Sequence, residues 1–129
     1  MQLDLSGKHA LVGGASQGIG RATAIELALL GADVTIIGRD TARLASTLAE
    51  LNSLGTNRYQ ALVGDYADRG QLERVVADWL APHPAQILIN NTGGPAPGPI
   101  ELATEAAFLD TFGQHLLCNQ LLTRLALPG

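Results

Sequence analysis

The sequence predicts an α/β fold, a doubly wound parallel sheet with helices on both faces, and three observations support this class. Four short apolar runs alternate along the chain with segments of helical periodicity. The second and fourth runs are almost continuous in aliphatic residues, which is typical of strands buried on both faces. A glycine-rich turn directly follows the first run. Strands that alternate with helices in this way favour right-handed crossovers and a parallel sheet.

The apolar runs predict four strands, at residues 9–12, 34–37, 59–63 and 86–89. Apolar stripes at helical spacing predict four helices, at residues 22–29, 44–54, 72–80 and about 105–127. Gly31 is placed to end the first helix, and Asp68 with Gln71 has the spacing of a capping box before the third. Residues 93–99 are rich in glycine and proline, which predicts a loop.

Length and composition set the limits for the class of protein. The 129 residues suit a single domain over residues 1–129, and 47% of them are hydrophobic, which argues against disorder. The net charge of −4 gives no reason to expect a nucleic-acid partner. No run approaches 18 apolar residues, so a membrane span is not expected. With no secretory signal at the start and a single cysteine, Cys118, the cytoplasm is the expected location.

The glycine-rich turn lies where the first strand passes into its helix. Glycine there allows a tight turn and lets backbone N–H groups approach a pyrophosphate, which the helix N-terminus also attracts. By itself, such a turn is also compatible with a purely structural connection. The residues expected to hold a dinucleotide here are Gly14, Ser16, Gln17, Gly18, Ile19 and Gly20.

The spacing of these glycines, Gly-x-x-x-Gly-x-Gly, resembles that of the short-chain dehydrogenase/reductase family, with Gly13 where the family usually has threonine. Asp65, after the third strand, resembles the aspartate that the family places at the adenine, and the backbone of Tyr66 would touch that ring. The resemblance extends to Asn90-Asn91-Thr92-Gly93, which is similar to the family's Asn-Asn-Ala-Gly beside the cofactor ribose. It covers the whole chain and implies a Rossmann-type sheet of order 3-2-1-4, ending before a fifth strand. Asp65 and the asparagines, taken singly, could also be ordinary loop residues.

The end of the second strand bears on the choice between NADP and NAD. An NAD enzyme usually has an acidic residue there for the ribose 2′-hydroxyl, whereas this chain has Gly38 followed by Arg39. A guanidinium can pair with a 2′-phosphate, and Ser16 and Arg43 could assist. We therefore expect NADP rather than NAD, although both arginines could also be solvated charges at the start of a helix.

The family's proton-transfer pair, Tyr-x-x-x-Lys, is absent from these residues, since Lys8 is the only lysine. Alignment from Asn90 places the family's catalytic asparagine at His115, and Asn119 lies one turn later. Either residue could substitute, the relay could differ, or His115 could be a polar residue on a partly exposed helix. The resemblance thus implies the N-terminal half of a longer oxidoreductase, and we expect this part alone to be inactive.

Three functions are compared on this basis. The first is the NADP-binding half of an enzyme that transfers hydride between NADP(H) and a carbonyl or alcohol. The loop at 90–99 resembles that of 3-oxoacyl-[acyl-carrier-protein] reductase-like members, so the substrate could be a small molecule or carrier-bound. The second is a non-catalytic dinucleotide-binding or interaction module. The third, a methyltransferase that uses S-adenosylmethionine, is disfavoured by Gly38, where that class normally has an acidic residue.

The expected sheet also predicts self-association. If strand four is an edge, Ile87 and Ile89 lie on an unpaired apolar strand, which is prone to pair with other chains. The last helix carries Phe108, Phe112 and Leu116 on one stripe, and in the family this helix often contributes to subunit contacts. We therefore expect a homo-oligomer that forms through the last helix, the strand-four edge or both. No metal-ligand spacing is present.

Overall fold

The computed structural model describes residues 3–93 and 97–129 and contains one sheet. Its strands are β1 (His9–Val12), β2 (Asp33–Gly38), β3 (Tyr59–Val63) and β4 (Ile87–Ile89). They lie in the order β3-β2-β1-β4, and each neighbouring pair is parallel. The predicted doubly wound, Rossmann-type sheet of order 3-2-1-4 is therefore confirmed. Both β3 and β4 are edge strands among the described residues.

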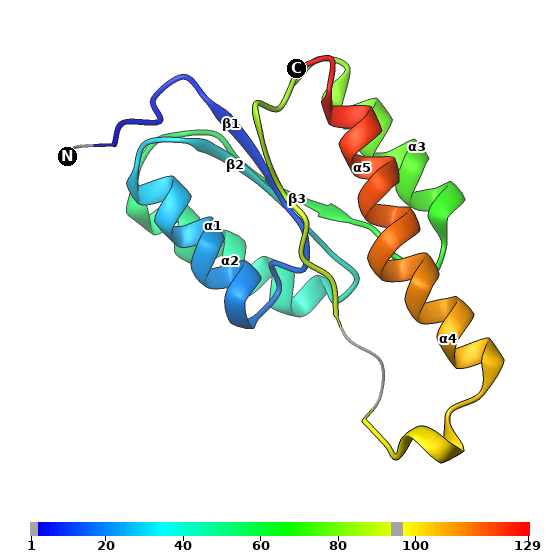
Figure 1. The fold of residues 1–129 in the computed structure, drawn as a ribbon. Coiled ribbons are helices and arrows are strands. Elements are labelled where there is room, and N and C mark those ends of the chain that lie inside the picture. Colours follow the sequence, from blue (N-terminus) through cyan, green and yellow to red (C-terminus); the bar gives the residue numbers. More distant parts are fainter. Residues whose placement is uncertain (1–2, 94–96) are drawn as a thin grey trace.

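Helices cover the sheet on both faces (Figure 1). They are α1 (Gly18–Leu29), α2 (Thr41–Leu54), α3 (Arg69–Leu80), α4 (Glu105–Phe112) and α5 (Cys118–Ala126), with a short 3₁₀ turn at Ile100–Leu102. Helices α1 and α2 lie on one face, and α3 and α5 lie on the other. Of the predicted loop at 93–99, residues 94–96 lie outside the described residues, and the rest is neither helix nor strand.

The alternation of side chains along β1 divides the core into two clusters. Ala10 and Val12 point to one face, where they pack with the buried residues of α1 and α2. Leu11 points to the other face, where it packs with Leu72, Val76 and Leu122 of α3 and α5. Both faces of β1 are buried, so the strand is held in the sheet up to Val12. Its end therefore sets the position at which the glycine-rich turn begins.

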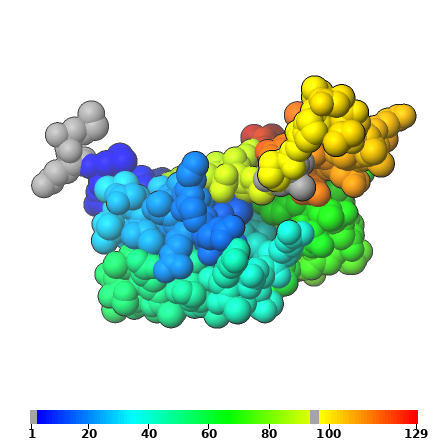
Figure 2. All heavy atoms as spheres, turned by 90° about the horizontal axis from the view of Figure 1, so that it is seen from below, coloured from blue at the N-terminus to red at the C-terminus, as the bar shows by residue number. Residues whose placement is uncertain are grey.

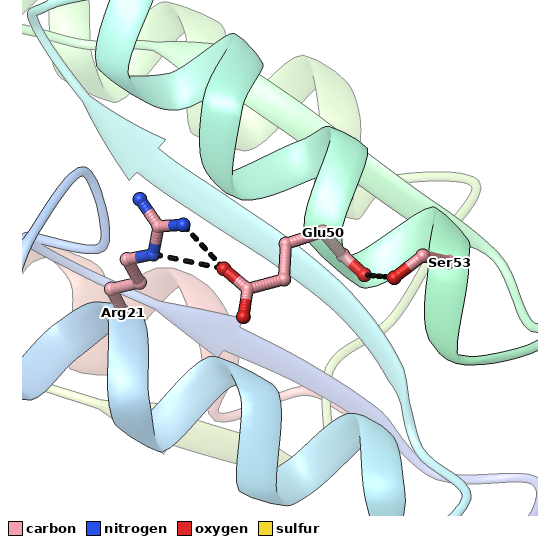
Figure 3. Close-up of polar contacts among 3 residues, drawn as sticks. All are labelled: Arg21, Glu50 and Ser53. Carbon is pink, nitrogen blue, oxygen red and sulfur yellow. Dashed lines mark hydrogen bonds and ion pairs between the residues drawn. The ribbon is translucent and has the colours of Figure 1, made fainter.

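Helices α1 and α2 are also joined by a polar contact across their partly exposed flanks (Figure 3). The guanidinium of Arg21 donates from Nε to Glu50 Oε2 at 3.2 Å, and its Nη2 bonds the same oxygen. Ser53 Oγ donates to the backbone carbonyl of Glu50 at 2.6 Å. This contact links the helix that begins at the glycine-rich turn with the helix that follows β2.

Three of the helices begin with a side-chain cap. Asp40, Asp68 and Thr104 each accept a backbone N–H three residues later, at 3.1 Å in every case. The capping box at Asp68 is only half present, because the Gln71 side chain instead donates to the carbonyl of Val63. At α1 the cap position is Gln17, which makes no cap, and no acidic residue lies in the first turn. The first N–H groups of α1 are therefore left without a side-chain acceptor.

The last predicted helix, over about 105–127, is present as a helical segment over residues 105–126, but it contains one π turn that the sequence did not predict. Between α4 and α5 the backbone forms a π turn at Gly113–Leu117. Gly113 is buried there, and a Cβ on it would lie only 2.8 Å from Arg69 Nη1. The stripe of Phe108, Phe112 and Leu116 is more than half exposed, and the segment leading into α4 projects from the body of the molecule (Figure 2).

Candidate functional site

A cavity of about 570 Å³ lies at the carboxyl ends of the strands, where ligands bind in open parallel sheets. Every residue predicted to bind cofactor lines it, except Gly20. Three further residues line it that the sequence did not single out: Asp40, Gly64 and Gln114. The full lining is Gly14, Ser16, Gln17, Gly18, Ile19, Gly38, Arg39, Asp40, Arg43, Gly64, Asp65, Tyr66, Asn91, Thr92, Gly93 and Gln114.

Close backbone approach explains the glycines of the turn. Gly14 and Gly18 have φ of +57° and +60°, which is the left-handed region that favours glycine. A Cβ on Gly20 would overlap the carbonyl oxygen of Gly14, so α1 can start this close to the turn only with glycine there. Asn91 Nδ2 donates to the carbonyls of Gly13 and Gly14 at 3.4 and 3.3 Å. These two hydrogen bonds connect the segment after β4 to the glycine-rich turn.

The uncapped N-terminus of α1 gives the turn its chemistry. Backbone N–H groups without an acceptor and the positive end of the helix dipole together favour an anion. The other helices that start with a cap have already supplied an oxygen acceptor from their own side chains. Ile19 is largely exposed in the first turn and lines the cavity, so this end also offers an apolar surface beside the anion position.

Two arginines stand at the β2 end of the cavity, and their surroundings differ. Arg43 donates from Nη1 to Gln17 Oε1 at 2.6 Å, and its Nε lies 3.4 Å from Asp40 Oδ2. Arg39 is exposed and has no hydrogen-bond or ion-pair partner in residues 3–93 and 97–129. Gly38 packs against Leu44, since a Cβ on it would lie 3.2 Å from Leu44 Cδ2. The described cavity wall therefore carries two guanidinium groups and one carboxylate at this end.

Asp65 and Tyr66 line the β3 end. Asp65 Oδ1 accepts the backbone N–H of Ala67 at 2.9 Å, which leaves its other carboxylate oxygen for a ligand. The Tyr66 hydroxyl is buried without a hydrogen-bond partner among the described residues, and burial raises the pKa of this phenol well above its ordinary value. A Cβ on Gly13 would overlap the Tyr66 hydroxyl. The backbone carbonyl oxygen of Asn91 would also lie only 2.8 Å from that Cβ, so position 13 has no room for a side chain.

The two candidate catalytic residues lie on the helical segment that faces the end of β4. His115, in the π turn, has Nδ1 2.7 Å from Thr92 Oγ1, and Thr92 lines the cavity. His115 itself does not line it, whereas its neighbour Gln114 does. Asn119 lies on α5 with a buried Oδ1 that has no partner among the described residues. One turn further, Thr123 Oγ1 accepts from Asn90 Nδ2 at 3.3 Å.

Sequence reasoning missed Asp40, Gly64 and Gln114, and two of these differ in the signal that they offer. Asp40 has a readable signal, because aspartate directly before a helix that follows a strand is a common cap. Gln114 has none, because the π turn rotates its position relative to a regular helix. No group of three or more metal-ligating side chains is found within the described residues. In the same ranges, none of the helices is long and apolar enough to cross a bilayer.

Comparison with known proteins gives the family. The model of the family described as short chain dehydrogenase matches residues 8–129. The chain belongs to the short-chain dehydrogenase family. L-xylulose reductase of Caenorhabditis elegans, for example, is 35% identical over 128 residues, which cover 94% of this chain and 49% of that protein. The resemblance seen in the glycine-rich turn and in the Asn-Asn-Thr-Gly segment is therefore confirmed.

Solved structures of short-chain dehydrogenases share the fold. L-sorbose reductase from Gluconobacter frateurii, complexed with NADPH and L-sorbose, has a TM-score of 0.90 at 27% identity over 99% of this chain and 49% of that one. A 3-oxoacyl (acyl-carrier-protein) reductase from Agrobacterium tumefaciens C58 with NADP bound has a TM-score of 0.88 at 28% identity, over 98% and 49%. The chain spans less than half the length of four curated relatives, from 36% to 49%.

Proposed function

We propose that this chain is the NADP-binding part of a short-chain dehydrogenase that transfers hydride between NADP(H) and a carbonyl or alcohol substrate. The observation that carries the proposal is the uncapped start of α1 beside a turn in which Gly14 and Gly20 leave no room for a Cβ. The cavity has a suitable anion position at one end and a free guanidinium, Arg39, at the other. Solved relatives of the same fold were crystallised with NADPH or NADP.

Each part of the cavity has a proposed task in holding the nucleotide. Backbone N–H groups of residues 14–20 bind the pyrophosphate, and Ser16 adds a hydroxyl. Arg39 binds the 2′-phosphate, and Arg43 adds positive potential. The free oxygen of Asp65 and the backbone of Tyr66 hold the adenine, while Asn91, Thr92 and Gly93 line the ribose. When bound, the cofactor supplies or accepts the hydride.

His115 and Asn119 are the proposed polar groups of this chain near the reacting centre. Thr92 lines the cavity and its Oγ1 bonds His115 Nδ1, so a proton at this hydroxyl can pass to the imidazole. The family's Tyr-x-x-x-Lys pair is not among these residues, and we propose that the chain by itself binds cofactor without turnover. Mixing it with NADPH and short ketones should leave the 340-nm absorbance constant; steady oxidation would contradict this part of the proposal.

Calorimetric titration tests the binding proposal directly. We expect NADPH to bind more tightly than NADH, and Arg39→Gln to weaken NADPH binding about tenfold or more while changing NADH binding little. Gly20→Ala should abolish binding of both, since its Cβ displaces the turn. Gly70→Ala is the matched control, because a Cβ there meets only ordinary contacts at 3.6 Å and lies outside the cavity. Uptake of neither nucleotide by the folded protein would overturn the proposal.

The alternative is a dinucleotide-binding module without catalytic function, which would use the same cavity. It predicts the same nucleotide affinities but no turnover with the complete gene product. Turnover by the complete product would exclude it.

A further inference from the structure

Asp40 places a negative charge at the end of the cavity where the proposed 2′-phosphate lies. Its Oδ1 caps α2 by accepting the Arg43 N–H at 3.1 Å, and its Oδ2 lies 3.4 Å from Arg43 Nε. Arg43 is also held by Gln17 Oε1 on the other side. One of the two arginines at this end is thus already engaged by a carboxylate of the same chain, and only Arg39 is free of partners in the described structure.

A phosphate and a carboxylate compete for the same favourable positions. The N-terminus of α2 and the Arg43 guanidinium would both stabilise a phosphate, but Asp40 occupies the cap and neutralises the arginine. A phosphate monoester carries nearly two negative charges at neutral pH, so the carboxylate also repels it. A ribose 2′-hydroxyl carries no charge and can donate to a carboxylate. Asp40 therefore acts against NADP and not against NAD.

The ion pair between Arg43 and Asp40 contributes little to the stability of the fold. The side chains of Arg43 and Asp40 are 58% and 44% exposed, and exposed ion pairs contribute little to stability. Losing the pair therefore costs the fold little, so neutralising Asp40 leaves a folded protein in which Arg43 meets a phosphate without a competing carboxylate.

From this arrangement we propose that Asp40 is a specificity-determining residue that limits the preference of the site for NADP(H) over NAD(H). The proposal rests on the proposed function, since it assumes a dinucleotide in this cavity. Neutralising Asp40 frees Arg43 and removes the repulsion, and the preference for NADP(H) rises.

The test is calorimetric titration of NADPH and NADH with Asp40→Asn. Asparagine keeps the cap oxygen and is as good a cap as aspartate, so α2 is retained. The dissociation constant for NADPH should fall about three- to tenfold, and that for NADH should stay constant or rise. In about 1 M salt the gain should shrink, because exposed charges are then screened. Asp40→Ser, a second neutral cap, should give the same result and replaces the first variant if that one folds poorly.

Asp68→Asn is the matched control. Asp68 caps α3 with the same geometry, at 3.1 Å from the Gln71 nitrogen, lies outside the cavity, and its substitution changes the net charge equally. It should leave the NADPH to NADH ratio unchanged. If the unmodified protein binds NADPH and Asp40→Asn does not improve the ratio beyond Asp68→Asn, this inference is wrong while the proposed function stands. If the unmodified protein binds neither nucleotide, both fail.

Discussion

Two threonines are almost completely buried, and their hydroxyl groups are used in opposite ways. Thr35 Oγ1 lies 2.9 Å from Trp79 Nε1, which donates to it, and 2.7 Å from His9 Nε2. His9 Nδ1 faces two backbone carbonyls, of His83 and Pro84, so it carries the proton and Nε2 accepts from Thr35. Thr47 Oγ1, in contrast, has no partner within the described residues.

The substitution of valine for each threonine should therefore give different results. Thr35→Val leaves the Trp79 N–H and His9 Nε2 unpaired in a buried place, and we expect the free energy of unfolding to fall by about 2 kcal/mol or more. Thr47→Val removes a hydroxyl that bonds nothing and should be neutral or slightly stabilising. Urea unfolding of both variants checks these two predictions. Equal decreases in the free energy of unfolding would show that the hydrogen bonds of Thr35 do not stabilise the fold.

Tyr66 makes stability depend on pH in the alkaline range. Burial, together with the nearby Cys118 thiol, raises the pKa of its phenol above the ordinary 10.0. The folded state thus holds this proton more tightly than the unfolded state, so the contribution is complete below pH 10 and is lost as the pH rises through the folded pKa. We expect the free energy of unfolding to fall more steeply above pH 10 in the unmodified protein than in Tyr66→Phe. Parallel slopes for the two proteins would contradict this.

At the scale of elements, the Arg21–Glu50 contact joins α1 to α2 beside the site (Figure 3). Both side chains are partly exposed, so solvent and salt screen the attraction. A double-mutant cycle with Arg21→Met and Glu50→Gln should give a coupling of about 1 kcal/mol or less, and the coupling should shrink in high salt. A larger coupling that is independent of salt would mean that the pair is more rigid than its exposure indicates.

The strands and their order could be predicted from the sequence because their signal is local. Runs such as Val34–Ile37 are apolar throughout, and alternation with helices leaves few topologies. The π turn within the last helix could not be predicted. The π turn adds a residue to one turn where Gly113 lies against Arg69, and that contact joins residues far apart in the chain.

The same division holds for the site. The positions of the turn's glycines and of Arg39 at strand ends predict that they bind the cofactor, whereas Asp65 is predicted to do so only by the resemblance to the family. The partners of individual side chains could not be foreseen, because hydrogen bonds such as His115–Thr92 and Arg43–Gln17 join residues more than twenty positions apart. The sequence thus located the cavity without showing which of its charges are already engaged.

For the whole molecule, two features leave apolar surface or backbone without a partner: the outer edge of β4 and an exposed apolar stripe on the last helical segment. Strand β4 pairs only with β1 among the described strands, and the stripe of Phe108, Leu109, Phe112 and Leu116 is more than half exposed. Both features favour association with another chain. We expect light scattering to give a mass above that of the 13.4 kDa monomer.

Substitutions on this stripe locate the contact. Phe108→Glu with Phe112→Glu should shift the mass toward the monomer if the last helix is used. Leu29→Glu is the matched control, since Leu29 is 59% exposed on α1, away from the stripe. A monodisperse monomer before any substitution would exclude self-association at that concentration.

The uncapped start of α1 also makes the stability of the protein depend on the concentration of the ligand proposed to bind there. The N–H groups at the start of α1 are brought together only in the folded chain, so the proposed nucleotide would bind the folded chain and not the unfolded one. At a free concentration a hundred times its dissociation constant, such a ligand adds about 2.7 kcal/mol to stability. With the proposed nucleotide bound, the protein should therefore resist heat and proteolysis better than it does alone.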